Sequence, residues 1–217
     1  MKIHKIPNQI INGKLTPLNL SKVTGIALHH MAQDKWSVKD VEAYHVYSNK
    51  WIAIGYNYWI DFDGTIYEGR GLNVGAHIEG FNSTTIGIGF RGNFQSGTNI
   101  GLTKMTDEQF NAGIDLINWL KEKIPTIKKV GGHKDFAPSQ CPGNTFPLAE
   151  MISGKKREVE EIMIYNYIDK NMPEWAHAAV KWAVDNGVVK GTGEGLGLTD
   201  QDLKYITWLY RAIEKRG

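Results

Sequence analysis

The segment VTGIALHHM, residues 23–31, is the one around which the rest of this chain can be arranged. Its residues are mostly apolar and favour extended backbone, a composition that predicts a buried β-strand. Successive side chains of a strand point to opposite faces of its sheet, so His29 and His30 must lie on different sides. At most one of these two histidines can therefore belong to a site on a given face.

Strand and helix patterns alternate around this segment. A helix is expected to begin at Ser37, with Asp40 at its third position, and a hairpin is expected to turn tightly at Asp63-Gly64. Two further strands are expected, over 84–92 and 127–132. A second helix is expected to begin at the capping box Thr106-x-x-Gln109 and to stop before Pro125, with Phe110, Ile114, Ile117 and Leu120 inside. This order predicts an α/β fold, in which helices flank a mixed central β-sheet over residues 1–152.

The pattern changes after residue 152. The charged stretch SGKKREVEE predicts a linker over 153–163, followed by a small all-helical domain over 164–217. The expected helix features are Trp175, Ala179, Trp182 and Ala183 facing inward, an end at Gly187, a cap at Thr199, and Leu203, Ile206 and Leu209 inside. About 55 residues make a small core, so docking on the first domain and association into a homodimer both stay open.

Composition excludes several classes of function. Of the 217 residues 41% are hydrophobic and 22% charged, and the net charge is +2, so no strong field points to nucleic acid or to an anionic membrane. No apolar run approaches the length of a membrane span. The first residues, MKIHKIPNQI, lack the apolar stretch of a signal peptide. We therefore expect synthesis in the cytoplasm and, for any role outside the cell, release by another route.

The single cysteine, Cys141, lies in the loop GHKDFAPSQCPG, residues 132–143. One cysteine cannot form an intrachain disulfide, and the flanking prolines indicate a loop rather than a packed core element. Two chemical roles stay open: a nucleophilic thiolate with His133 as its base, or a thiolate bound to a metal. A catalytic metal site needs three protein ligands and an open position for water, and the third ligand would come from the His29-His30 pair.

Three stretches resemble the zinc-dependent N-acetylmuramoyl-L-alanine amidases, a family that includes phage lysozyme-type amidases and peptidoglycan recognition proteins. They are IALHHMA, AIGYNYWIDFDGTIYEGRGLNVGAHIEGFNSTTIGIGFRGNF and GGHKDFAPSQCPG, and they occur in the order expected for the family. The resemblance covers most of residues 20–150. It implies the peptidoglycan-recognition and phage-lysozyme amidase fold, and it makes residues 1–152 the catalytic domain.

The resemblance also implies roles for individual residues. Its zinc (Zn2+) ligands fall on His29, His133 and Cys141, and its catalytic tyrosine falls on Tyr56, which we expect to donate a hydrogen bond to the developing oxyanion. The second catalytic position, two residues before the cysteine, is Ser139, as in the recognition proteins rather than the lysozyme-type enzymes. The implied substrate contacts are His77, Asn57 (where the family commonly has histidine), and the pair Gly71 and Leu72.

The implied activity is hydrolysis of the amide between N-acetylmuramic acid and the L-alanine of the stem peptide, most simply in a phage endolysin acting on bacterial peptidoglycan. The alternatives are a bacterial autolysin, a Cys-His peptidase of the wall, and a non-catalytic peptidoglycan-binding protein. The last 50 residues are similar to a degenerate S-layer-homology repeat, which implies binding of a secondary wall polymer. A helical cap with a purely stabilising role is the alternative for that segment.

Overall fold

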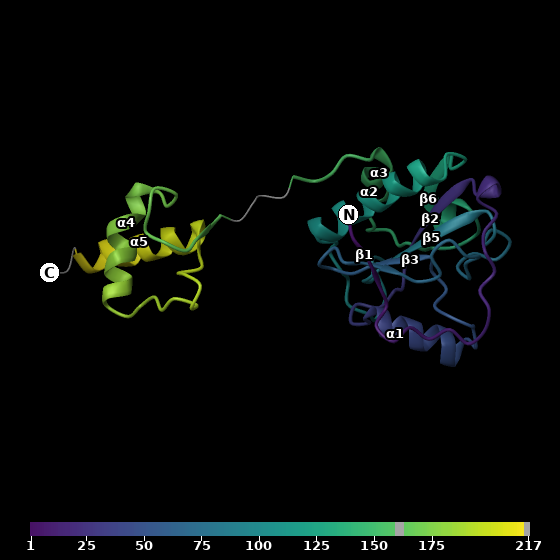
Figure 1. The fold of residues 1–217 in the computed structure, drawn as a ribbon, viewed down its shortest axis with the longest axis horizontal. Coiled ribbons are helices and arrows are strands. Elements are labelled where there is room, and N and C mark those ends of the chain that lie inside the picture. The colour runs from purple at the N-terminus through teal and green to yellow at the C-terminus, as the bar shows by residue number, and fades with distance from the viewer. Residues whose placement is uncertain (159–162, 215–217) are drawn as a thin grey trace. The chain divides into compact units, whose positions relative to one another are not determined.

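The computed structural model describes residues 1–158 and 163–214, and the chain divides into two compact units, residues 1–159 and 160–217 (Figure 1). No helix among the described residues is long and apolar enough to cross a lipid bilayer. The roles predicted for the two segments and for the linker between them stay predictions.

The first unit is built on a six-stranded mixed sheet. Its strands, in spatial order, are β1 (Ile3–Lys5), β4 (Ile66–Glu68), β3 (Tyr58–Ile60), β5 (Thr85–Phe90), β2 (Gly25–His30) and β6 (Lys129–Gly132). Only the β3–β4 hairpin is antiparallel. All the predicted strands are present, with β6 at one edge of the sheet, and β1 at the other edge is a strand that sequence patterning did not indicate.

Helices cover both faces of the sheet. In Figure 1, α2 (Asp107–Lys123) and α3 (Leu148–Ser153) lie on one side and α1 (Val38–Ala43) lies on the other. A π-helical turn, Tyr44–Ser48, continues α1, and two short 3-10 turns span Leu20–Lys22 and His133–Asp135. The predicted mixed α/β architecture is therefore what the structure has.

The two faces of β2 and β5 differ in side-chain size. Ile26 and Leu28 pack with Ile86, Ile88 and Phe90 in the core under α2, where the predicted stripe of that helix is also buried. On the opposite face Ala27 pairs with Gly87 and His29 pairs with Gly89. A side chain at Gly87 or Gly89 would overlap the rings of His77 and Tyr56, because an added Cβ would lie only 2.5 and 2.6 Å from them. This face of the sheet thus has room for aromatic and histidine rings.

The predicted helix starts are present, with one difference. Ser37 and Asp40 form a complete capping box at α1. At α2 the Thr106 hydroxyl accepts a hydrogen bond from the backbone N–H of Gln109. The Gln109 side chain does not bond to the backbone N–H of Thr106, so the capping box is incomplete. Its amide donates instead to the carbonyls of Ile60 and Arg91, at 3.1 and 3.0 Å. A buried amide with two sheet carbonyls in reach is used to join α2 to the strands rather than to cap the helix.

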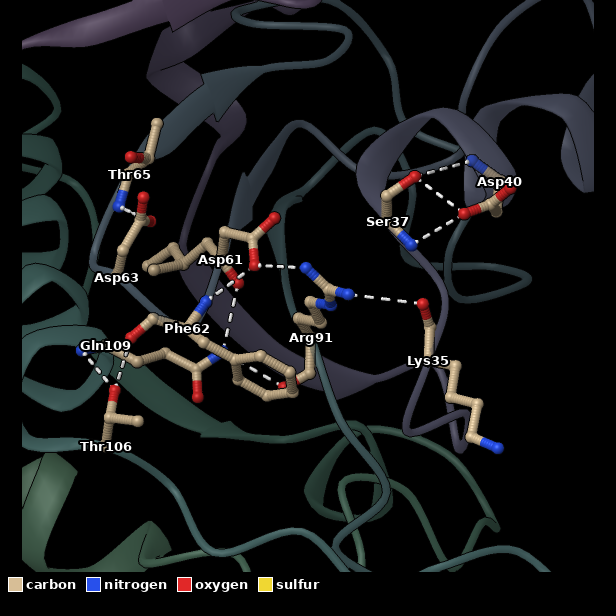
Figure 2. A network of polar contacts seen from close by, with 11 residues as sticks. Lys35, Ser37, Asp40, Asp61, Phe62, Asp63, Thr65, Arg91, Thr106 and Gln109 are labelled. Carbon is tan, nitrogen blue, oxygen red and sulfur yellow. Dashed lines mark hydrogen bonds and ion pairs between the residues drawn. The ribbon is translucent and has the colours of Figure 1, made fainter.

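The predicted hairpin is present, but its turn is longer than the expected two residues. The N–H of Asp61 donates to the carbonyl of Thr65, and Gly64 has a φ of 78°. Figure 2 shows how the Asp61 carboxylate then meets Arg91 at 2.9 Å, while a second guanidinium nitrogen reaches the Lys35 carbonyl. The ion pair between Asp61 and Arg91 attaches the hairpin to the residue that follows β5.

The second unit has its own core. It contains α4 (Glu174–Asp185) and α5 (Asp200–Glu214), and the buried residues are Tyr165, Met172, Ala176, Ala179, Val180, Ala183, Leu198, Leu203 and Ile206. Thr199 caps α5 through Asp202, and Gly187 follows α4 with a φ of 69°, both as predicted.

Two predictions for this unit are wrong. The unit is not purely helical, because β7 (Ile164–Tyr165) and β8 (Leu198–Thr199) form a small antiparallel sheet. The sheet holds the chain that enters the unit against the start of α5. Trp175 does not face inward but is 46% exposed, since it lies in the first turn of α4, beyond the alanine stripe that packs on α5.

Candidate metal centre

The structure brings His29, His133 and Cys141 together. Their ligand atoms all lie within 4.8 Å of one another, and His29 Nδ1 is 3.6 Å from Cys141 Sγ. The rings of His29 and His133 meet edge to face with centroids 5.0 Å apart. Two imidazoles and a thiol at this separation form a donor set typical of zinc sites.

Sheet topology accounts for this convergence. Strands β2 and β6 are parallel neighbours, and Leu28 pairs with Gly132, so His29 and His133 follow at the same edge. The loop from His133 to Cys141 is closed by a 3.0 Å hydrogen bond from the N–H of Lys134 to the carbonyl of Cys141. The Asp135 carboxylate accepts the N–H of Gly132, as expected for a residue that stabilises the loop.

His77 contacts the other side of the His29 ring. The distance from His29 Nε2 to His77 Nδ1 is 3.1 Å, and Gly75 and Gly87 leave space for the His77 ring. Asn82 fixes the segment, because its side-chain oxygen accepts the N–H groups of His77 and Ile78. His77 also lines a surface depression of about 340 Å³ with Trp51, Ile78, Glu79 and Asn82, among others. It thus contacts His29 and forms part of the lining of that depression.

Burial sets the protonation of the cluster. It lowers the pKa of His29 well below its usual value, reinforced by the charges that His77 and His133 would carry, and it also lowers the pKa of His133. The same effect lowers the pKa of His77 to about 3 and raises that of the Cys141 thiol to about 12. A neutral imidazole beside a protonated thiol is the reverse of the ion pair that activates a cysteine nucleophile. A bound cation would instead favour the thiolate and take the imidazole lone pairs.

Tyr56 lies beside this cluster and is almost completely buried. Its ring is 5.3 Å from that of His29, and its hydroxyl contacts only the sulfur of Met31, at 3.8 Å, among the described residues. Burial raises the pKa of Tyr56 above its usual value, with a further contribution from the Cys141 charge. The phenol therefore keeps its proton and can donate a hydrogen bond close to the candidate metal site.

The predicted substrate contact Asn57 makes its hydrogen bonds within the protein. Asn57 is fully buried: its amide donates to the carbonyls of Gly71 and Asn73, and its oxygen accepts the N–H of Gly87. All its polar groups are thus taken by backbone, and Gly71 is one of its partners. Leu72 is partly buried and packs against the main core, and substrate contacts at Gly71 and Leu72 stay predictions.

Two further residues belong to the loops and strands that support the cluster. The Ser139 hydroxyl accepts the N–H of Cys141 at 3.1 Å and so shapes the loop that carries the thiol. His30 lies on the opposite face from His29, and its Nδ1 accepts the N–H of Phe94 at 3.0 Å. Sequence reasoning placed His30 correctly through strand alternation, but it did not find the roles of Gly75, Gly87 and Asn82. The Gly-x-Gly alternation within β5, at Gly87 and Gly89, was the available signal for Gly87.

A mixed sheet with two histidines and a cysteine at one edge defines a candidate metal-dependent hydrolase. The family model described as N-acetylmuramoyl-L-alanine amidase (Amidase_2) matches residues 19–144, more than half of the chain, and the chain belongs to this family. The match lies within the first unit and includes His29, His133 and Cys141.

Individual relatives agree with this assignment. Peptidoglycan-recognition protein SC2 of Drosophila melanogaster is 35% identical over 127 residues, which are 54% of this chain and 66% of that protein. The mouse N-acetylmuramoyl-L-alanine amidase is 28% identical over 118 residues, 49% of this chain and 20% of that protein. The chain thus spans less than two thirds of these curated relatives.

Solved structures show the same fold. The endolysin N-acetylmuramoyl-L-alanine amidase LysCS from Clostridium intestinale URNW superposes with a TM-score of 0.61 at 29% identity, over 70% of this chain and 93% of that one. Peptidoglycan recognition protein LE, solved with tracheal cytotoxin, gives a TM-score of 0.56 at 29% identity, over 67% and 86%. The predicted fold class is confirmed by these similarities.

Proposed function

We propose that this protein is a zinc-dependent N-acetylmuramoyl-L-alanine amidase that cleaves the bond between the lactyl group of N-acetylmuramic acid and the L-alanine of the stem peptide. The observation that carries the proposal is the cluster of His29, His133 and Cys141 ligand atoms within 4.8 Å, in a chain of the amidase family. Membership of the family alone does not distinguish cleavage from recognition, whereas a complete set of three ligands favours cleavage.

The residues of the site would have separate roles in this reaction. His29, His133 and the Cys141 thiolate would hold the ion, which supplies Lewis-acid activation of a water molecule and of the scissile carbonyl. His77 keeps Nδ1 of His29 directed at the cluster, since it contacts the other ring nitrogen. Tyr56 donates a hydrogen bond to the carbonyl oxygen as negative charge develops on it.

A recognition protein that binds peptidoglycan without cutting it is the second candidate. Its support is that several curated relatives are named peptidoglycan-recognition proteins. A Cys-His peptidase is disfavoured by the high pKa of Cys141 and the low pKa of His133. Between the biological settings, we propose a phage endolysin that reaches the wall after synthesis in the host cytoplasm. The similarity to LysCS, which is described as an endolysin, supports that setting over an autolysin.

For the second unit we propose a wall-retention role, supported by its resemblance to an S-layer-homology repeat. It has a core of its own, as a separate binding module requires. The ligand in this proposal is a secondary polymer of the bacterial wall rather than the stem peptide.

The test is incubation of the purified chain with a soluble muropeptide, followed by mass spectrometry of the products. The amidase releases a peptide with a free L-alanine amino group, loses activity to a chelator and regains it with zinc. A recognition protein binds the muropeptide and releases nothing. A thiol peptidase cuts between amino acids, resists chelation and is inactivated by iodoacetamide, so each rival has its own product pattern.

A further inference from the structure

The second unit carries a cavity of about 730 Å³ that no part of the proposed amidase site uses. It is lined by Trp175 at the start of α4 and by one stripe of α5: Lys204, Thr207, Trp208, Arg211 and Ala212. The stripe follows the spacing i, i+3, i+4, i+7, i+8, so these side chains share one face of the helix. The adjoining side of α5 contributes Leu203 and Ile206 to the core.

The two indoles on this face are unusually accessible. Trp175 is 46% exposed and Trp208 is 65% exposed, although large aromatic side chains are normally buried to a high degree. An exposed aromatic group that lines a concavity indicates a binding surface. The flat face of an indole packs well against the C–H groups of a sugar ring, while the hydroxyl groups of the sugar stay available for hydrogen bonds.

The charged groups that line the cavity favour an anionic ligand. Lys204 and Arg211 both line it, no carboxylate lines it, and neither cation forms an ion pair within the described part of the chain. Thr207 is 5% exposed, and its hydroxyl is buried without a hydrogen-bond partner in the same described part. A ligand with an anionic group would pair with both cations.

A second copy of the chain fits the same face less well. In a two-fold contact the identical surfaces meet, so Lys204 and Arg211 would approach the same two cations of the partner. Like charges opposed across an interface oppose association. Charge therefore favours an acidic ligand over self-association.

We infer that the cavity between Trp175 and the Lys204–Ala212 stripe of α5 is a binding site for an acidic saccharide, with Trp208 and Trp175 against the sugar rings and Arg211 and Lys204 on the anionic group. The inference rests on the proposed wall-retention role and identifies the site and chemical class of its ligand. The muropeptide hydrolysed by the first unit is a different molecule.

The test uses the full chain and insoluble Gram-positive walls, either intact or stripped of their phosphodiester-linked anionic polymers with hydrofluoric acid. Retention is measured by rapid cosedimentation at 4 °C, for wild type, Trp208→Ala, Arg211→Glu and the control Tyr167→Ala. Tyr167 is 66% exposed in the same unit but does not line the cavity. Hydrolysis of a soluble muropeptide is measured in parallel, and it reports on the amidase proposal independently of wall retention.

We expect retention on intact walls to fall at least tenfold for Trp208→Ala and for Arg211→Glu. Retention of wild type should fall by a similar factor on stripped walls. Muropeptide hydrolysis and thermal unfolding of the two variants should be unchanged. The Tyr167→Ala variant should be retained like wild type. The inference is overturned if wild type fails to bind intact walls, if it binds both wall types equally, or if the cavity variants bind like wild type. A wild-type dimer in sedimentation velocity that Trp208→Ala converts to a monomer would assign this face to a second copy and would also overturn it.

Discussion

Nε2 of His29 lies 3.1 Å from Nδ1 of His77, while Nδ1 of His29 faces the sulfur of Cys141 at 3.6 Å. One imidazole thus connects the candidate metal ligands to a histidine from a different loop. If Nε2 of His29 carries the proton and donates it to His77, the lone pair of Nδ1 points into the cluster. The contact therefore orients the ring of a ligand, and in this tautomer it leaves Nδ1 available to an ion.

Substitution of His77 should weaken metal binding without removing a ligand. We expect His77→Ala to lower zinc affinity about 10- to 100-fold, the usual effect of losing a group that orients a ligand. His77→Asn, which keeps an acceptor near the position of Nδ1, should recover part of the loss. The measurement is competition with a chromophoric chelator. His177→Ala, which alters a histidine of the second unit bonded to the Met172 carbonyl, is the control, and equal affinities for all variants would contradict the role of His77.

Gly87 should be required because of the His77 ring. A Cβ at Gly87 would lie 2.5 Å from that ring, so Gly87→Ala should destabilise the fold by about 1 to 3 kcal/mol. In the background of His77→Ala the added methyl group has space, and the same substitution should have little effect. Urea unfolding of the four proteins of this cycle gives the coupling. Additive effects would show that the two residues do not compete for space.

Asn57 should matter for stability rather than for substrate affinity. Asn57→Ala leaves two carbonyls and one N–H of the backbone without partners, and we expect the free energy of unfolding to fall by about 3 kcal/mol. KM for a soluble muropeptide should stay the same in protein that remains folded. Asn171→Ala, at an exposed position, serves as the neutral control. A higher KM with unchanged stability would return Asn57 to the substrate contacts.

His45 should make the metal-free protein less stable in acid. Its Nδ1 accepts the N–H of Gly55, and burial lowers its pKa from 6.5 to about 4. The unfolded imidazole takes up a proton below pH 6.5, whereas the folded one does so only near pH 4. The contribution of His45 is therefore complete above pH 6.5 and is lost as the pH falls to 4, by up to about 3 kcal/mol.

The variant His45→Asn keeps an acceptor for Gly55 but does not titrate in this range. Its unfolding free energy, measured in chelator at pH 7 and pH 4.5, should fall about 2 kcal/mol less than that of wild type over the same interval. An identical fall in both proteins would mean that His45 is not held neutral by the fold.

Sequence patterning predicts most of the first unit because its signals are local. Burial of β2, the caps at Ser37 and Thr106 and the inner stripe of α2 depend on residues within a few positions of one another. Three features depend instead on neighbours that are distant in the sequence. They are the hydrogen bonds of the Gln109 side chain to strand carbonyls, the longer hairpin turn and the exposed position of Trp175. Local pattern cannot indicate such partners.

The candidate site also combines features that local sequence predicts with features that depend on distant residues. Alternation along β2 separates His29 from His30. The loop GHKDFAPSQCPG makes His133 and Cys141 candidates, and the resemblance to the amidase family assigns them as ligands. The contact between His29 and His77, and the full use of the Asn57 amide by backbone, depend on how the 70–87 segment folds over β5. Whether a polar residue near a motif binds a ligand or holds the backbone in place therefore becomes clear only when its hydrogen-bond partners are known.

The most direct test of the proposed function is the zinc content of the purified chain, measured by mass spectrometry alongside release of stem peptides, for wild type and Cys141→Ser. We predict about one zinc ion per wild-type chain, and loss of both metal and peptide release in the variant, with thermal unfolding showing that it remains folded. A wild-type protein that releases stem peptides while containing no metal and resisting chelation would contradict the proposal.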